Sequence, residues 1–208
     1  AGILLSTAMQ LGPPNPAVFS LAGDIQNNQG NYPAALTAGL RALTLDSNDT
    51  SAVYVVGMAL SNSGQPQKAH PYLSRALGAF SQEAPLWRMY GVSCSSIGKM
   101  DDALLAFQKA VDLDPTNAGF VSDLGFTFFL QGRHEAALAC YDRAIKISPE
   151  MGLAYYNKAM AYHAMGEEGK ALDNLNRARN AGYPGSPKFQ AEVEKAAHQA
   201  VPAQPSGP

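Results

Sequence analysis

Small residues recur along the chain at a constant spacing of 34 positions. Five glycines define the first column of this pattern: Gly30, Gly64, Gly98, Gly132 and Gly166. Three more columns, which begin at Gly23, Ala35 and Ala42, hold only Gly or Ala, with no insertion or deletion. A self-similar period of this length is typical of stacked repeats, in which each unit packs mainly against its neighbours.

Each repeat is predicted to be two helices joined at the glycine. In the third unit, apolar residues before the glycine follow the i, i+3, i+4, i+7 spacing of one helix face: Trp87, Tyr90, Gly91 and Cys94. A second stripe follows the glycine: Ala103, Phe107 and Ala110. The pair Asp114-Pro115 ends the second helix because proline lacks the amide hydrogen and disfavours a helical residue before it. The predicted units are 16–49, 50–83, 84–117, 118–151 and 152–185.

The remaining Gly and Ala columns are expected where two helices cross. Helices approach to about 8–10 Å only if the side chains at the contact are small. A larger residue at such a crossing is expected to overpack it and cost about 1–3 kcal/mol or more.

The third unit resembles the tetratricopeptide repeat, a 34-residue helix–turn–helix. The matching residues are Trp87, Tyr90-Gly91, Gly98, Ala103, Phe107, Ala110 and Pro115. The resemblance covers residues 16–185 and implies an all-α fold, a right-handed superhelix (α-solenoid) of five units whose first helices line a concave face. It is weaker in the first unit, where Ala22, Gln26 and Gly39 replace bulky residues. We therefore expect that unit to be loosely packed or to act as a cap.

The two ends fall outside the five repeats. Residues 186–199 are amphipathic and begin with Ser186-Pro187, so they predict a helix that caps the last repeat. Residues 200–208 are proline-rich and are expected to be disordered. Residues 1–15 predict a short helix or an extended segment packed on repeat one; the remains of a signal or anchor segment are the alternative.

Pro71 lies in the second helix of the second unit, five residues after Pro66. Because an interior proline costs a helix about 3 kcal/mol, we expect the helix to begin near Pro71. A local hinge in the superhelix is the alternative.

Charge and composition exclude several classes of protein. Fifteen Lys and Arg against 17 Asp and Glu give a net charge of −2, so general nucleic-acid binding is not expected. No run of 18 apolar residues predicts a membrane-spanning helix. Cys94 and Cys140 are interpreted as small buried hydrophobic residues rather than a redox pair. These features predict a soluble protein, cytoplasmic or periplasmic.

Residue patterns typical of catalysis are missing from the sequence. The four histidines are not spaced as metal ligands, and neither a nucleophile motif nor a phosphate-binding glycine loop is present. Asp101-Asp102 begins a helix, where negative charge favours the helix dipole. The sequence therefore predicts a non-enzymatic protein without a cofactor.

The family resemblance implies that the inward positions of the first helices bind the partner. In repeat one these include Ser20 and Asp24. The candidate groove residues of the later repeats are Tyr54, Met58, Arg88, Met89, Val92, Asp123, Phe126, Phe129, Tyr156, Asn157, Met160 and His163. Their aromatic and Met side chains predict an apolar strip that binds proteins. The alternative is that some of them pack between neighbouring first helices.

The predicted function is a scaffold or adaptor that binds an apolar peptide or helix of a partner protein. The carboxylate clamp of Lys, Asn and Arg, with which the family's co-chaperones hold acidic chaperone tails, is not present at the corresponding positions, so acidic tails are not expected. The compact, Ala-rich repeats resemble those of bacterial proteins of pilus assembly and secretion. Two alternatives stay open: a homo-oligomer whose groove binds a terminal segment of a sister molecule, and a regulatory domain of a longer enzyme.

Overall fold

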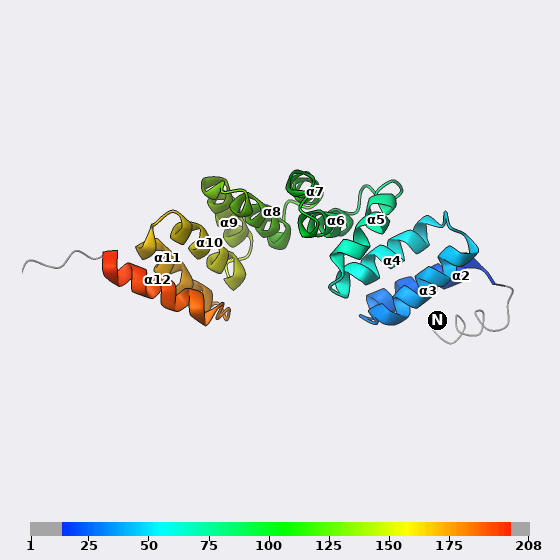
Figure 1. Cartoon of the computed structure of the whole chain (residues 1–208), viewed down its shortest axis with the longest axis horizontal. Helices are drawn as coiled ribbons and strands as arrows, with labels where there is room; N and C mark the ends of the chain where they lie inside the picture. Colours follow the sequence, from blue (N-terminus) through cyan, green and yellow to red (C-terminus); the bar gives the residue numbers. More distant parts are fainter. Residues whose placement is uncertain (1–13, 201–208) are drawn as a thin grey trace, which may run out of the picture. The chain divides into compact units, whose positions relative to one another are not determined.

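The computed structural model describes residues 14–200, and all regular secondary structure in that range is α-helical (Figure 1). Ten helices form five consecutive pairs: α2 (Pro16–Asn28) with α3 (Tyr32–Leu45), α4 (Thr50–Asn62) with α5 (Pro66–Ala76), α6 (Ala84–Ser96) with α7 (Met100–Leu113), α8 (Ala118–Leu130) with α9 (His134–Ile147), and α10 (Gly152–Ala164) with α11 (Glu168–Asn180). Helix α12 (Pro187–Ala200) follows the last pair. The fold is an all-α solenoid, as predicted.

The glycine column forms the turns between paired helices. All five of its glycines have positive φ, between 71° and 80°, a conformation that residues with a Cβ avoid. The residue after each glycine donates its N–H to a carbonyl five residues back, as Lys99 does to Cys94 at 2.9 Å. This bond satisfies a carbonyl at the helix end, so each turn is closed by the backbone itself.

The column of small residues that begins at Gly23 lies where paired helices cross. A Cβ added to Gly57 would lie 2.9 Å from the Leu73 side chain, and one added to Gly125 would lie 2.9 Å from Tyr141. These distances are shorter than normal carbon contacts. The predicted reason for the small residues, close approach of two helices, is confirmed.

The first repeat is not loosely packed, so that one of the two expectations for it is wrong; its role as a cap stays a prediction. Ala35 and Ala42 are fully buried. A Cβ on Gly23 would lie 2.5 Å from Val55, and one on Gly39 would lie 2.7 Å from Val56. Small residues in this repeat therefore let the valines of α4 fill the space that larger side chains fill elsewhere.

Helix α5 begins at Pro66 and continues through Pro71, so the prediction of a start near Pro71 is wrong. Pro71 cannot donate to the carbonyl of Gln67, but both residues are exposed, and water can satisfy that carbonyl. The same helix buries Ala69 and Leu73 on its inner side. Burial of these residues offsets the loss of one hydrogen bond.

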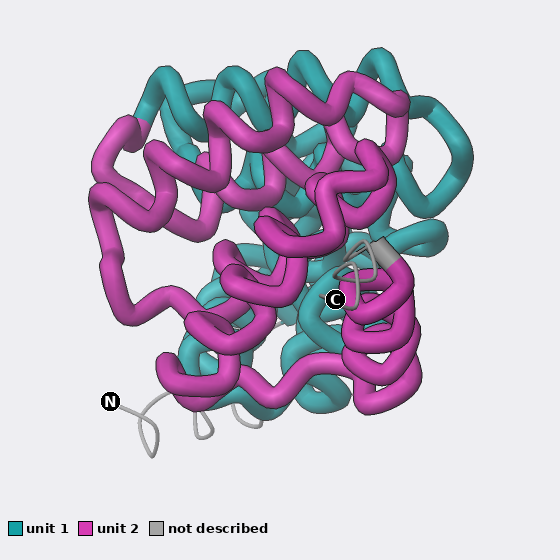
Figure 2. Tube along the Cα trace, turned by 90° about the vertical axis from the view of Figure 1, so that its left-hand side faces the viewer, with its two compact units in different colours: residues 1–113 teal, residues 114–208 magenta. Residues whose placement is uncertain are grey.

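The chain forms two compact units, residues 1–113 (unit 1) and 114–208 (unit 2), each with its own core (Figure 2). In unit 1 one buried cluster joins α4, α5 and α6 and includes Leu73 and Leu86. In unit 2 one cluster includes Leu175 and Val193, so α12 packs on the last repeat as predicted. The predictions for the terminal segments fall on residues 1–13 and 201–208, outside the described residues.

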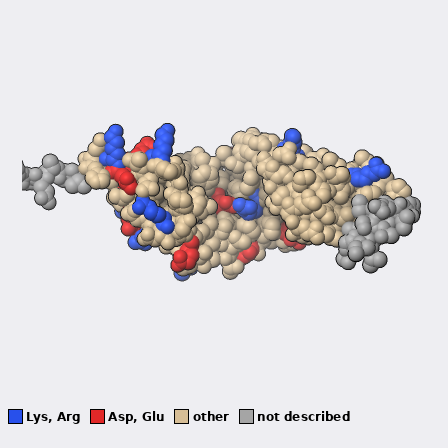
Figure 3. Space-filling model, turned by 90° about the horizontal axis from the view of Figure 1, so that it is seen from below, with Lys and Arg blue, Asp and Glu red and all other residues tan. Residues whose placement is uncertain are grey.

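Surface charges are scattered among uncharged side chains on the face shown in Figure 3. None of the described helices is both long enough and apolar enough to cross a bilayer.

Candidate functional site

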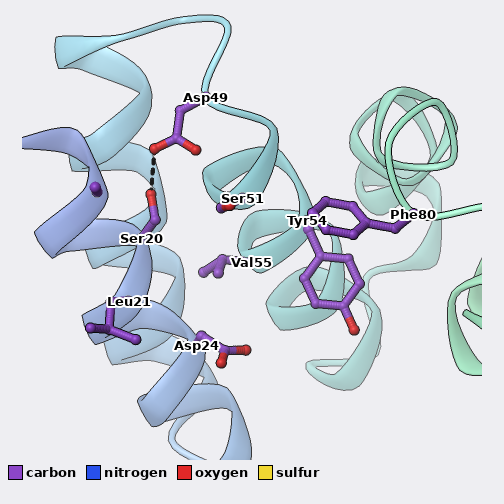
Figure 4. A pocket seen from close by; sticks show the side chains of 9 residues that line it. Ser20, Leu21, Asp24, Asp49, Ser51, Tyr54, Val55 and Phe80 are labelled. Carbon is purple, nitrogen blue, oxygen red and sulfur yellow. Dashed lines mark hydrogen bonds between the residues drawn. The ribbon is translucent and has the colours of Figure 1, made fainter.

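The first helices of neighbouring repeats lie side by side within each unit, α2, α4 and α6 in unit 1 and α8 and α10 in unit 2. We call the surface that they form the first-helix face of that unit. In unit 1 it contains a pocket of about 330 Å³ between α2 and α4, which we call the α2–α4 pocket (Figure 4). The lining residues are Ala17, Ser20, Leu21, Asp24, Asp49, Ser51, Tyr54, Val55 and Phe80.

One wall of the α2–α4 pocket is aromatic. Tyr54 extends from α4 beside Phe80, which follows α5, and the two ring centroids are 5.1 Å apart with the planes tilted by 50°. Leu21 on α2 belongs to the other wall and is 54% exposed. In Figure 4 the carboxylate of Asp24 points to the side on which Tyr54 lies.

The pocket is acidic, and its two carboxylates differ in their contacts. Asp49 caps α4 by accepting the N–H of Ala52 at 3.0 Å, and it also accepts the hydroxyl of Ser20 at 2.5 Å. Among residues 14–200, Asp24 accepts only a long hydrogen bond, 3.5 Å, from the side-chain amide of Asn28. Burial raises the pKa of Tyr54, and the charges of Glu83 and Asp24 raise it further. The charged side chains that line the α2–α4 pocket are therefore negative.

The other predicted groove residues of unit 1 are half-buried: Met58, Arg88, Met89 and Val92. Met89 packs against the core cluster of α4, α5 and α6. Met89 is therefore partly a packing residue between neighbouring helices, which was the alternative to a groove position in the sequence analysis.

In unit 2 the first helices expose large apolar residues on both α8 and α10, where Leu153 is 38% exposed, and two of them lie together on α8. Phe126 is 37% exposed and Leu130 is 47% exposed, one helical turn apart. The ring of Phe129 lies 6.0 Å from that of Phe126, with the planes 23° apart. Phe129 also packs against the core cluster around Tyr141, and Asp123 on the same helix is half-buried. On α8, then, Phe126 and Leu130 are exposed, while Phe129 is partly covered.

On α10 the predicted groove residues contact the chain's own C-terminal region. The ring of Tyr156 lies 5.3 Å from that of Tyr183 and 5.5 Å from that of Phe189 on α12. His163 lies 5.4 Å from the same Phe189 ring, and its Nδ1 is 2.8 Å from Glu168. These two side chains hold α12 in place.

Two further residues of α10 were predicted to line the groove. Asn157 is only 8% exposed, so its assignment to an open groove needs correction. Met160 is half-buried.

Sequence reasoning missed Leu21 and Phe80 as pocket residues. Leu21 stands at the same repeat position as Met89, Asp123 and Asn157, which were assigned to the groove, so the 34-residue spacing is the signal that could have found it. Phe80 follows the end of α5, outside both apolar stripes of its repeat. The one signal for Phe80 is a large aromatic residue close to the predicted boundary between repeats 50–83 and 84–117.

A second hollow, of about 600 Å³, lies on another side of unit 1, between α5, α6 and α7. Trp87 and Tyr90 line it together with Leu105, which is 66% exposed. This surface serves below as a comparison for the first-helix face.

Both cysteines are free thiols that are at least partly covered by the fold. Cys94 is buried, with its Sγ 3.8 Å from Nδ1 of His70, and Cys140 is half-buried. Burial raises the pKa of both thiols, which favours the protonated, unreactive form. Among the described residues, no three His, Cys, Asp or Glu side chains are grouped as they would be to hold a metal ion.

Comparison with known protein families agrees with this architecture. Residues 55–118 match the family model "Tetratricopeptide repeat", and residues 127–166 match the family model "TPR repeat". The chain is a tetratricopeptide repeat protein.

Solved structures of other tetratricopeptide proteins share the fold. YrrB, a TPR protein with an unusual peptide-binding site, superposes with a TM-score of 0.77 at 20% identity, covering 94% of this chain and 100% of that one. MamA superposes with a TM-score of 0.68 at 22% identity, covering 91% and 97%.

A curated relative is much longer than this chain. Anaphase-promoting complex subunit 3 of Schizosaccharomyces pombe is 23% identical over 176 residues, which cover 85% of this chain. The chain spans 26% of that protein's length.

Proposed function

We propose that this tetratricopeptide repeat protein is a non-enzymatic scaffold that binds an apolar segment of a partner protein on its first-helix faces. The observation that carries the proposal is the exposure of Phe126 and Leu130 on α8. Large apolar side chains exposed together, beside a second aromatic ring such as that of Phe129, are typical of protein-binding surfaces. The peptide-binding site named for YrrB, which shares the fold, supports the same use of this architecture.

Burial of apolar surface supplies the driving force. Each Å² removed from water contributes about 25 cal/mol, and the ordering of the bound segment offsets part of that gain. The rigid helices of the repeats reduce the ordering cost on this side of the interface. An acidic segment is disfavoured on unit 1, because Asp24 and Asp49 line the α2–α4 pocket.

Affinity capture from a lysate of the source cells tests the proposal. The bait variant Phe126→Glu/Leu130→Glu places two charges on the exposed part of α8. Leu105→Glu is the control, because it places a charge at an exposed apolar residue of α7, outside the first-helix face. We expect the wild type and the control to retain a common partner and the double variant to lose it.

Thermal unfolding of the same variants shows whether a loss of partner binding is caused by unfolding of the variant. Both variants should melt close to the wild type, since the substituted side chains are exposed. Retention of the partner by the double variant would contradict the proposal, and so would a large drop in its melting temperature, which would place Phe126 and Leu130 in the core.

Light scattering separates a partner protein from a second copy of this chain. Deletion of residues 1–13 leaves Asn15 as the cap of α2. If the full chain is an oligomer that this deletion converts to a monomer, the groove binds a sister segment instead of a different protein.

A further inference from the structure

The α2–α4 pocket carries a negative charge that breaks the repeat pattern of the first helices. Asp24 belongs to a column whose other members, at 34-residue intervals, are all apolar: Met58, Val92, Phe126 and Met160. Four repeats thus place an apolar side chain at this position of the first helix, and repeat one places a carboxylate there. Packing does not require this exception, because Asp24 is half-exposed and makes a single long hydrogen bond within the part of the chain that the structure describes.

We propose that the α2–α4 pocket binds a Lys or Arg side chain of the partner's segment, with the cation at Asp24 and the aliphatic stem between Leu21 and the rings of Tyr54 and Phe80. This inference rests on the proposed function, since it names the chemistry of the segment that the first-helix face binds.

The size of the pocket suits one long side chain. Pockets that take whole small-molecule ligands span roughly 300–1,000 Å³, and this one, at about 330 Å³, lies at the lower limit. Its walls are mostly apolar, with Leu21 and Val55 near the aromatic pair. Lys and Arg carry their charge on a flexible apolar stem, which packs on such walls.

The charges of the pocket favour a cation. The lining contains two carboxylates and no Lys, Arg or His, and neither α2 nor α4 contains such a residue. Asp49 is occupied by Ser20 and by the N-terminus of α4, whereas Asp24 has no ion pair among the described residues. Glu83 adds a further negative charge near Tyr54.

Other side chains fit the same pocket less well. A purely apolar side chain would remove water from the Asp24 carboxylate without replacing its hydrogen bonds, which is unfavourable. An acidic side chain would be repelled by Asp24. A cation beside Tyr54 or Phe80 also gains the attraction between positive charge and an aromatic face.

Titration with four small molecules that share a butyl group tests the inference. The probes are n-butylguanidinium, n-butylammonium, 1-butanol and pentanoate, added to the ¹⁵N-labelled full chain and followed by amide chemical shifts. We expect saturable shifts at residues of α2 and α4 around Leu21, Asp24 and Tyr54 with the two cations. Their dissociation constants should be about millimolar, because probes of this size have few atoms to bind with.

Asp24→Asn is the decisive variant, because it keeps the size of the side chain while removing its charge. We expect it to weaken binding of n-butylguanidinium about tenfold, as for the loss of a charge-assisted contact. Asp112→Asn is the matched control, because it removes one exposed carboxylate from α7 of the same unit. That control should bind both cations as the wild type does.

Several outcomes would overturn the inference. These are equal binding of 1-butanol and the cations in the pocket, cation binding that Asp24→Asn leaves unchanged, and no saturable shift with either cation. Amide spectra of each variant also report whether it is folded; should Asp24→Asn not fold, the salt dependence of cation binding to the wild type replaces it, and binding that salt leaves unchanged overturns the inference. None of these results bears on Phe126 and Leu130, whose own variants test the proposed function.

Discussion

Asp24 and Phe126 occupy the same position of the repeat, three repeats apart, yet they give the two units different surfaces. Both lie on a first helix, and the next first helix carries a tyrosine at a shared position, Tyr54 in unit 1 and Tyr156 in unit 2. Positions that pack, such as Gly57 and Gly125, are small in both units. The comparison shows that packing fixes the residue type at some positions of the repeat. At the position of Asp24 and Phe126 packing leaves the residue type open, so it can differ between repeats to suit what each surface binds.

The two tyrosines show that a neighbour decides whether a surface is open. Each contacts a ring from the segment after the next helix, Phe80 for Tyr54 and Tyr183 for Tyr156. Tyr156 is in addition covered by Phe189 of α12, whereas Tyr54 lines the α2–α4 pocket. Unit 2 therefore uses its tyrosine to hold the terminal helix, and unit 1 leaves its tyrosine available.

The largest effect, on partner affinity, is expected from Phe126→Asp. This substitution gives repeat four the aspartate that repeat one has at the same position. Loss of a central aromatic contact of an interface typically costs 2 kcal/mol or more, so affinity for the captured partner should fall by about thirtyfold or more. Binding titrations measure this, with Leu105→Asp as the control on α7. Similar affinities for Phe126→Asp and the wild type would remove α8 from the interface.

A smaller effect, on stability, is expected from Gly185→Ala. Gly185 has a φ of +63°, and a Cβ there would lie 2.2 Å from the Tyr156 ring. The clash and the unfavourable backbone together should cost about 3 kcal/mol in urea unfolding. Gly30→Ala is the control: its φ is +75° but nothing lies within 4 Å of the added Cβ, so about 1 kcal/mol is expected. Equal losses would mean that Tyr156 is not held by the segment before α12.

Phe189→Ala should loosen α12 by about 1–2 kcal/mol, because Phe189 is half-buried against Tyr156 and His163. Hydrogen exchange should become faster in α12 and stay unchanged in α2 and α4. Unchanged protection of α12 would show that the Phe189 ring does not contribute to docking the helix.

The smallest effect concerns the phenol of Tyr54. Its pKa is raised by burial and by the charges of Glu83 and Asp24, so Asp24→Asn should lower that pKa towards the usual value. Because the folded-state pKa exceeds the unfolded value of 10.0, the stabilisation is complete below pH 10 and is lost as the pH rises above it. The difference in ultraviolet titration between the protein and Tyr54→Phe, measured with and without Asp24→Asn, gives the shift. An unchanged pKa would separate Asp24 from Tyr54 and weaken the case for the α2–α4 pocket.

The sequence predicted the turns and crossings because their requirements are local. Gly98 needs a positive φ and Gly57 needs space, and both needs recur in every repeat as the same small residue. The helix through Pro71 was not predicted, because the burial of Ala69 and Leu73 that sustains it is a tertiary effect.

Exposure on the first-helix face was predicted less well. Asn157 shares its column with the exposed Leu21 and the buried Val55, so a repeat position does not fix exposure. That column lies at the edge between neighbouring first helices, where the size of the adjacent side chain decides. Phe80 lines the α2–α4 pocket but belongs to the segment that connects α5 to α6. Helix periodicity makes no prediction for such a segment.

Photo-crosslinking from α8 tests the central claim most directly. p-Benzoylphenylalanine is placed at position 126, and in a second sample at position 105 on α7, and each protein is irradiated in a lysate of the source cells. We predict one dominant crosslinked protein from position 126 and none from position 105. Equal labelling from both positions, or no crosslink from position 126, would contradict the assignment of the first-helix face as the binding surface.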